Sequence, residues 1–154
     1  MNWLPMTPAD LDAVVAVEQS AYTHPWTRGQ FADSLAAGYD AWLVREQEEL
    51  IGYYLVMPVL DEVHLLNLTV APAHQGKGHG HALLRHMLGV ARLADAQSVW
   101  LEVRQSNERA LRLYLQHGFE RVGQRRDYYL VGHGRREMAL VLRRLLAQDE
   151  RALD

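Results

Sequence analysis

A glycine-rich turn in the middle of the chain, residues 75–80, constrains the fold more than any other segment. It reads Gln-Gly-Lys-Gly-His-Gly and separates an apolar run at residues 63–70 from an amphipathic run at residues 78–93. The first run predicts a central strand and the second a helix. Alternate glycines permit positive φ and let backbone N–H groups converge on an anion at a helix N-terminus. We therefore expect a phosphate or pyrophosphate site, the alternative being a turn that only joins strand to helix.

Two better-known phosphate loops do not fit this turn. A Walker loop needs Ser or Thr after Gly-Lys, whereas Lys77 is followed by Gly78. A dinucleotide fingerprint needs a first strand near the N-terminus and an acidic residue about 20 positions after the turn. ATP and NAD are therefore poor candidates for the ligand.

The remaining periodicity predicts a mixed sheet with helices packed on it. A helix is expected over residues 8–21, where the following residues recur at helical spacing: Leu11, Val14, Val15, Glu18 and Ala21. Further helices are predicted at 27–38, 78–93 and 107–117, and strands at 41–45, 50–58, 63–70, 98–104, 119–130 and 137–142. The last two strands should form a hairpin around Gly132-His133-Gly134, with a polar tail from Arg143. The order of strand, two helices, three strands, helix, strand, helix and two strands indicates the α/β or α+β class.

Composition narrows the function further. The 154 residues contain no linker or repeat, so we expect a single domain over residues 1–147 and a polar tail over 148–154. The absence of cysteine excludes disulfides, thiolate zinc sites and a thiol nucleophile. A formal net charge of −3 argues against a nucleic-acid partner. No apolar run approaches the ~20 residues that span a bilayer, so we expect no membrane partner and a cytoplasmic protein. The densest group among the eight histidines, His74, His79, His81 and His86, has no acidic ligand nearby, so no metal is assigned.

Glu102 is unusual because residues 99–103 otherwise have the pattern of a buried strand. Alternation places it on the same face as Trp100. A carboxylate there is expected to be partly desolvated, which would raise its pKa and make it a better base. The alternative is a Glu at a strand end that reaches solvent or pairs with Arg104.

Asn107 and Tyr114 are seven residues apart, about two turns of one predicted helix. Both are therefore expected on nearly the same helix face. Tyr114 is a candidate proton donor, and its alternative is a core aromatic.

The glycine turn resembles the coenzyme A pyrophosphate motif of the GNAT acetyltransferases, with Gln75, Gly78 and Gly80 at the motif positions, Val70-Ala71-Pro72 before it and Ala82-Leu83-Leu84 after it. The resemblance implies a three-layer α/β/α fold with a mostly antiparallel seven-stranded sheet, and acetyl-CoA as cosubstrate. It also implies that the pyrophosphate is held by the amides of Gly76, Lys77, Gly78, His79, Gly80 and His81. By the same resemblance, pantetheine pairs with the backbone of Leu68, Thr69 and Val70 and with Asn107.

Three further segments, residues 24–27, 100–104 and 125–129, are similar to those of the GNAT enzymes that acetylate the N-terminal alanine of a ribosomal protein. This similarity implies a Glu102 base, a Tyr114 acid and, as acceptor, the basic N-terminal segment of a ribosomal protein. Acceptor contacts are expected from Trp26, Tyr128 and Tyr129, with core packing as the alternative for Trp26. The chain departs from the pattern at residues 134–138, where Gly-Arg-Arg-Glu-Met replaces Gly-Arg-Glu-Asp-Ala. An acetyltransferase for lysine or a small-molecule amine, and a non-catalytic coenzyme A-binding module, are the alternatives.

Overall fold

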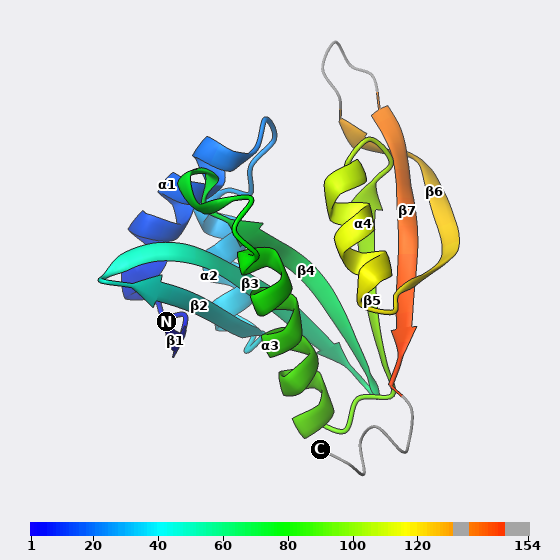
Figure 1. Cartoon of the computed structure of the whole chain (residues 1–154), viewed down its shortest axis with the longest axis horizontal. Coiled ribbons are helices and arrows are strands. Elements are labelled where there is room, and N and C mark those ends of the chain that lie inside the picture. Colours follow the sequence, from blue (N-terminus) through cyan, green and yellow to red (C-terminus); the bar gives the residue numbers. More distant parts are fainter. Residues whose placement is uncertain (131–135, 147–154) are drawn as a thin grey trace. The chain divides into compact units, whose positions relative to one another are not determined.

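A computed structural model describes residues 1–130 and 136–146 of the protein, with side chains for residues 1–126 and 137–146. Its strands and helices follow the predicted order (Figure 1). The strands are β1 (Asn2–Pro5), β2 (Asp40–Glu46), β3 (Glu49–Val59), β4 (Glu62–Val70), β5 (Ser98–Arg104), β6 (Glu120–Leu130) and β7 (Arg136–Leu145). The helices are α1 (Leu11–Ala21), α2 (Arg28–Ala36), α3 (His79–Leu93) and α4 (Glu108–Gln116), with 3₁₀ turns at Pro8–Asp10 and Pro72–His74.

The described strands form a seven-stranded mixed sheet in the order β1-β2-β3-β4-β5-β7-β6. β4 and β5 pair in parallel, with His64 opposite Trp100. β1 with β2, β2 with β3, β5 with β7, and β6 with β7 are antiparallel. The predicted mostly antiparallel sheet is confirmed.

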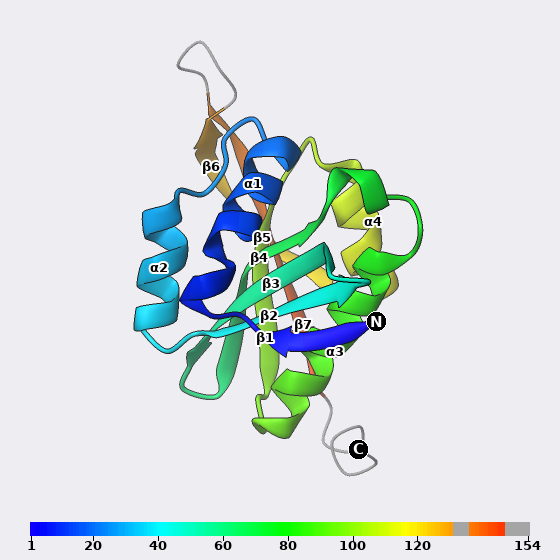
Figure 2. The same cartoon turned by 90° about the vertical axis from the view of Figure 1, so that its left-hand side faces the viewer.

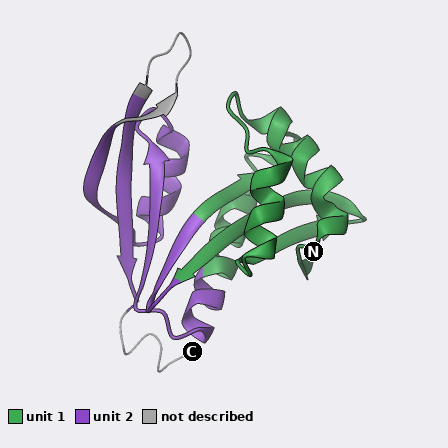
Figure 3. Ribbon diagram, turned by 180° about the vertical axis from the view of Figure 1, so that it is seen from behind, with its two compact units in different colours: residues 1–58, 66–87 green, residues 59–65, 88–154 purple. Residues whose placement is uncertain are grey.

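The chain divides into two compact units, shown in two colours in Figure 3. Unit 1 consists of residues 1–58 and 66–87, and unit 2 of residues 59–65 and 88–154. β4 and α3 therefore each contribute residues to both units. The predicted single domain over residues 1–147 stays a prediction.

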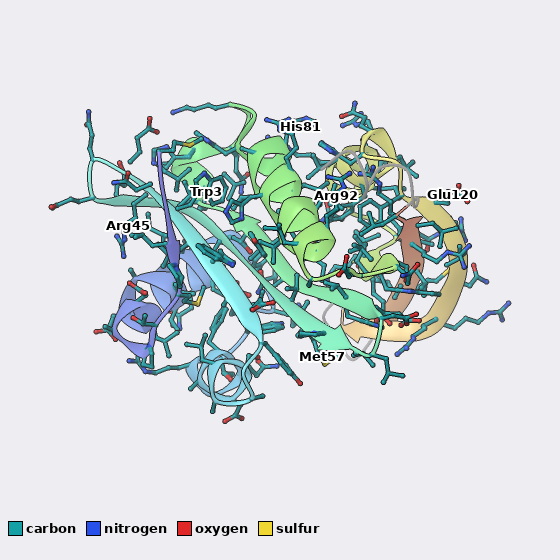
Figure 4. The ribbon with its side chains drawn as sticks, turned by 90° about the horizontal axis from the view of Figure 1, so that it is seen from below. Trp3, Arg45, Met57, His81, Arg92 and Glu120 are labelled. Carbon is teal, nitrogen blue, oxygen red and sulfur yellow. The ribbon has the colours of Figure 1, made fainter. Side chains whose placement is uncertain are left out.

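Unit 1 has helices on both faces of its strands because the side chains of β2 and β3 alternate. Figure 2 shows α1 and α2 side by side over β2 and β3. The core on that face combines helix and strand residues: Leu11, Val14, Phe31, Ala41, Leu43, Tyr53 and Leu55. The opposite face carries Trp42 and Tyr54, which contact His86 of α3. A third aromatic, Trp3 of β1, stacks on His86 with ring centroids 4.1 Å apart, and Figure 4 shows it beside α3. The three-layer arrangement predicted for the fold is present within this unit.

The β2–β3 hairpin closes through a two-residue turn, as the polar residues 46–49 suggest. Gln47 and Glu48 have φ of 51° and 67°. Positive φ at both central positions is the type I′ geometry that matches the twist of the flanking strands. Neither residue is glycine, so the turn carries some backbone strain.

Unit 2 buries one face of its strands. The apolar residues on this face are Val63, Leu65, Val99, Leu101, Val103, Leu140 and Leu142. Figure 1 shows α4 lying over β5 and β7. α4 begins after Asn107, whose Oδ1 accepts a hydrogen bond from Ala110 N at 3.2 Å, and it ends before Gly118, whose φ is +83°. Both helix ends agree with the capping pattern in the sequence.

The prediction of a polar tail that begins at Arg143 is wrong for residues 143–145. β7 continues to Leu145, because these residues still pair with residues 98–100 of β5 although the apolar pattern has ended. The guanidinium of Arg143 lies 5.5 Å from the Trp100 ring centroid, and Leu146 is buried. Among the described residues, no helix has the length and apolar character to cross a membrane.

Candidate functional site

Two glycines of the turn have the positive φ that the sequence predicts. Gly76 and Gly78 have φ of +80° and +86°. An added Cβ at Gly78 would meet nothing within 4 Å, so glycine is favoured there by the backbone conformation and not by lack of space. Gly80 lies inside the first turn of α3, so the expectation of positive φ at alternate glycines holds for two of the three.

The turn is tied to the strand that precedes it. The Gln75 side chain donates from Nε2 to the carbonyl oxygen of Val70 at 3.1 Å. Ala71 N donates to the Ile51 carbonyl at 2.8 Å, which anchors the same connection to β3. Ala82 N donates to the Gly78 carbonyl and closes the first turn of α3, whose preceding N–H groups point out of the helix end. The arrangement suits a diphosphate.

Lys77 and three histidines lie at or near the turn. Lys77 is exposed, and His81 lies at the start of α3 (Figure 4). His74 Nε2 lies 2.9 Å from Glu49 Oε1, and its ring is 6.1 Å from that of His79. Within residues 1–126 and 137–146 there is no group of three His, Asp or Glu side chains that would hold a metal ion.

The strand segment Leu68–Val70 lies in close contact with β3 and α1. A Cβ added to Gly52 of β3 would lie 2.6 Å from the Thr69 carbonyl oxygen, so the two backbones meet without a side chain between them. On the α1 side, the Tyr22 hydroxyl lies 2.7 Å from Thr69 Oγ1 and 3.4 Å from the Leu68 carbonyl oxygen. Unit 1 thus brings the predicted glycine turn and the predicted pantetheine strand into one hydrogen-bonded connection.

Glu102 is partly buried, with 24% of its side chain exposed, and it lies on the same face of β5 as Trp100. Both features were predicted. Its cationic partner is Arg125 of β6, whose Nε is 3.1 Å from Glu102 Oε1. Arg104, the partner considered as an alternative in the sequence, binds Glu137 of β7 at 3.2 Å.

Glu137 of β7 holds the turn that leads into α4. It accepts hydrogen bonds from Arg104, from Ser106 N at 3.2 Å and from Ser106 Oγ at 3.0 Å. Desolvation would raise the pKa of this carboxyl, but the hydrogen bonds from Ser106 and Arg104 outweigh it and lower the pKa. Glu137 lies in the segment where the chain departs from its family pattern, and its contact fixes the residue next to Asn107.

Tyr114 is buried, with 8% exposure, and its ring packs edge-on against Phe119 at 5.7 Å between centroids. Asn107 is the N-cap of the same helix, so both predicted residues of α4 lie in unit 2 with Glu102. The contacts of Tyr114 include those of a core aromatic, and its acid role stays a prediction.

The predicted acceptor residues are only partly described. Trp26 is partly buried, packs on the unit 1 core and lies 5.2 Å from the Phe31 ring, which are core-packing contacts. The side chains of Tyr128 and Tyr129, and the hairpin tip around Gly132-His133-Gly134, lie outside the described residues.

Sequence reasoning missed a buried polar group in unit 1. Glu18 is 2% exposed and accepts hydrogen bonds from Tyr53, Asn67 and the backbone of Trp26. Its position at the apolar spacing of α1 was the signal that could have found it, because a carboxylate among inward positions needs donors.

The chain belongs to the acetyltransferase (GNAT) family, whose pattern it matches over residues 11–119. It is an acetyl-CoA-dependent N-acetyltransferase, which confirms the family, the enzyme class and the cosubstrate predicted from the glycine turn.

Its relatives include enzymes that act on a ribosomal protein. The [ribosomal protein bS18]-alanine N-acetyltransferase of Haemophilus ducreyi is 34% identical over 133 residues, which cover 86% of this chain and 92% of the relative. The enzyme of the same name from Escherichia coli is 33% identical over 132 residues, covering 86% and 89%.

Solved structures agree with this fold. The crystal structure of the ribosomal-protein-S18-alanine N-acetyltransferase from Escherichia coli superposes with a TM-score of 0.89 at 31% identity, covering 96% of this chain and 94% of that one. Arabidopsis thaliana NAA60 in complex with acetyl-CoA shares the fold with a TM-score of 0.83 at 20% identity, covering 94% and 98%.

Proposed function

We propose that this enzyme acetylates the N-terminal alanine of a small-subunit ribosomal protein in the cytoplasm. The observation that carries the proposal is its 33–34% identity, over 86% of the chain, to relatives named for that reaction. Ribosomal proteins bind RNA phosphates through Lys and Arg, so we propose that the acceptor is a basic N-terminal segment.

The cosubstrate is proposed to bind along β4 and the glycine turn. The amides of residues 76–81 bind the pyrophosphate, and Lys77 adds charge beside it. The backbone of Leu68, Thr69 and Val70 pairs with pantetheine, to which Asn107 adds a side-chain contact. The positive φ of Gly76 and Gly78 and the Gln75 bond to Val70 support this placement.

The proposed reaction is a direct transfer from acetyl-CoA to the acceptor, without an acetylated enzyme as intermediate. The acceptor nitrogen attacks the thioester carbonyl carbon, a C–N bond forms, and the C–S bond breaks. Glu102, directly or through water, takes the amine proton, and Tyr114 gives its proton to the departing thiolate. Backbone N–H groups near Leu68–Val70 stabilise the oxyanion. An α-amino group, with an ordinary pKa of about 7.7 to 8.0, is easier to deprotonate than a lysine side chain at about 10.4.

The acceptor is proposed to contact Trp26, Tyr128 and Tyr129. The partial burial of Trp26 leaves part of its side chain accessible at the start of α2. Support for the two tyrosines is the match of residues 125–129 to the family pattern.

A thiol-release assay with acetyl-CoA tests the function. Peptides that begin with alanine followed by basic residues should release coenzyme A, and the same peptides with a blocked N-terminus and an added lysine should not. Release with only the blocked, lysine-containing peptides would contradict the proposal. Glu102→Gln should lower kcat by about 100-fold, because a positioned base contributes about that factor. A loss below about threefold would remove Glu102 from the base role.

A further inference from the structure

Glu18 of α1 is a buried carboxylate that the proposed reaction does not use. Its Oε1 accepts from the Tyr53 hydroxyl at 2.7 Å and from Asn67 Nδ2 at 3.1 Å, and its Oε2 accepts from Trp26 N at 2.9 Å. The three donors come from β3, β4 and the residues before α2. A buried carboxylate with three donors can only accept, so it fixes the direction of every hydrogen bond that leads away from it.

The direction of hydrogen bonding that Glu18 sets continues along β4 to Tyr22. Because Asn67 Nδ2 donates to Glu18, its Oδ1 is an acceptor, and it receives the Thr69 hydroxyl hydrogen at 2.7 Å. Thr69 has one hydroxyl hydrogen, which is then committed. The 2.7 Å contact between Tyr22 and Thr69 therefore has Tyr22 as the donor.

The Tyr22 oxygen is left with its lone pairs as the outer end of this chain. Tyr22 is 39% exposed, whereas Glu18 and Thr69 are each 2% exposed. Burial raises the pKa of Tyr22 and outweighs the hydrogen bond with Thr69, which lowers it, while the negative charge of Glu18 adds a smaller increase, so the phenol is neutral at neutral pH. A neutral oxygen whose hydrogen is already engaged binds hydrogen-bond donors and rejects acceptors.

We propose that Tyr22 binds the N–H groups of the acceptor amine, and that Glu18, Asn67 and Thr69 are positioning residues that hold its hydroxyl in the accepting orientation. The inference rests on the proposed function, because it places the amine beside the Leu68–Val70 segment that takes the thioester. The 3.4 Å between the Tyr22 oxygen and the Leu68 carbonyl oxygen puts the hydroxyl at this segment. Recognition is then of an amine with two or more N–H hydrogens.

Steady-state kinetics with an alanine-initiated peptide tests the chain of hydrogen bonds. Tyr22→Phe should raise the peptide KM about tenfold, the effect of one lost hydrogen bond to a polar or charged group, with the acetyl-CoA KM within twofold. Thr69→Val keeps the shape but cannot accept from Tyr22, so it should raise the peptide KM in the same way. Thr69→Ser keeps a hydroxyl that can accept from Tyr22, so it should restore the wild-type peptide KM.

The controls separate the two proposals. Tyr39→Phe, which removes a hydroxyl elsewhere in unit 1, should change neither KM, and thermal denaturation checks that each variant is folded. Glu18→Gln should also raise the peptide KM. If this variant does not fold, Tyr22→Phe, Thr69→Val and Thr69→Ser still test the inference. Suppose that the wild-type enzyme is active with the peptide. If Tyr22→Phe then leaves the peptide KM unchanged, or if Thr69→Ser raises it as Thr69→Val does, the inference about Tyr22 is wrong and the proposed function still stands. A wild-type enzyme that releases no thiol with any N-terminal peptide overturns the proposed function.

Discussion

Gly52 offers a sharp test of how β3 positions the cosubstrate strand. An alanine Cβ there would lie 2.6 Å from the Thr69 carbonyl oxygen and 2.9 Å from Leu83 Cδ1. The Leu83 methyl can rotate away, but the carbonyl belongs to the backbone. Cβ contacts shorter than 3.0 Å are essentially never seen. To bring the 2.6 Å contact to that limit, β3 and β4 must move apart by about 0.4 Å.

Gly52→Ala should therefore be destabilising and should disturb cosubstrate binding. Overpacking of this kind costs about 1 to 3 kcal/mol. At about 2 kcal/mol, the Tm should fall by about 4 to 8 °C for a chain of this size. Because Thr69 and Val70 are the proposed pantetheine contacts, the acetyl-CoA KM should rise about three- to tenfold.

Urea denaturation and acetyl-CoA kinetics measure the two effects. Gly123→Ala is the matched control, since it is also in a strand and its added Cβ would meet Val141 Cβ at an ordinary 3.8 Å. The control should stay within about 0.5 kcal/mol of wild type. If Gly52→Ala matched the control in both stability and acetyl-CoA KM, the close approach of β3 to β4 would have no role in the site.

Three further predictions follow from single side chains. Tyr114→Phe should lower kcat by about 100-fold with both KM values unchanged in steady-state assays, and an unchanged kcat would remove its acid role. Burial lowers the pKa of His86 below its ordinary 6.5, so the unfolded chain binds the proton first as the pH falls. The stability of the wild type should therefore decrease below about pH 6.5, and the urea midpoint of His86→Phe should decrease less. The lowered pKa of Glu137 means that its contribution is present above pH 4.5 and is lost as the pH falls through the folded-state pKa, so Glu137→Gln should lower stability by about 1 kcal/mol at pH 7 and by less near pH 3.

Local patterns in the sequence predicted the parts of the site that depend on neighbouring residues. Gly76 and Gly78 lie between a strand and a helix, and their backbone conformation follows from that context. Alternation along β5 placed Glu102 and Trp100 on one face, and the Asn107 cap followed from the start of the apolar helix pattern.

The partners of the charged residues could not be predicted, because they depend on strand register. β6 has an irregularity between Arg121 and Gly123 that changes which residues face β7. Arg104 and Arg125 both lie opposite Ala139 of β7. Arg104 binds Glu137, which is distant in sequence, and Arg125 binds Glu102.

The buried Glu18 was visible in the sequence but not interpretable from it. Its helical spacing marked it as inward-facing, but its donors come from residues 26, 53 and 67, on three other segments. Only the folded arrangement shows that a carboxylate at this position is satisfied.

The interleaving of the two units has a consequence for synthesis on the ribosome. Unit 1 needs residues 66–87 as well as its first 58, and the parallel partner of β5 is the earlier segment at residues 62–65. A nascent chain of which only the first 58 residues have left the ribosome therefore lacks part of unit 1. Because each unit consists of two separate segments, a single proteolytic cut cannot separate either unit intact. Contacts between such distant segments slow folding, so we expect the growing chain to complete unit 1 only after α3 has emerged.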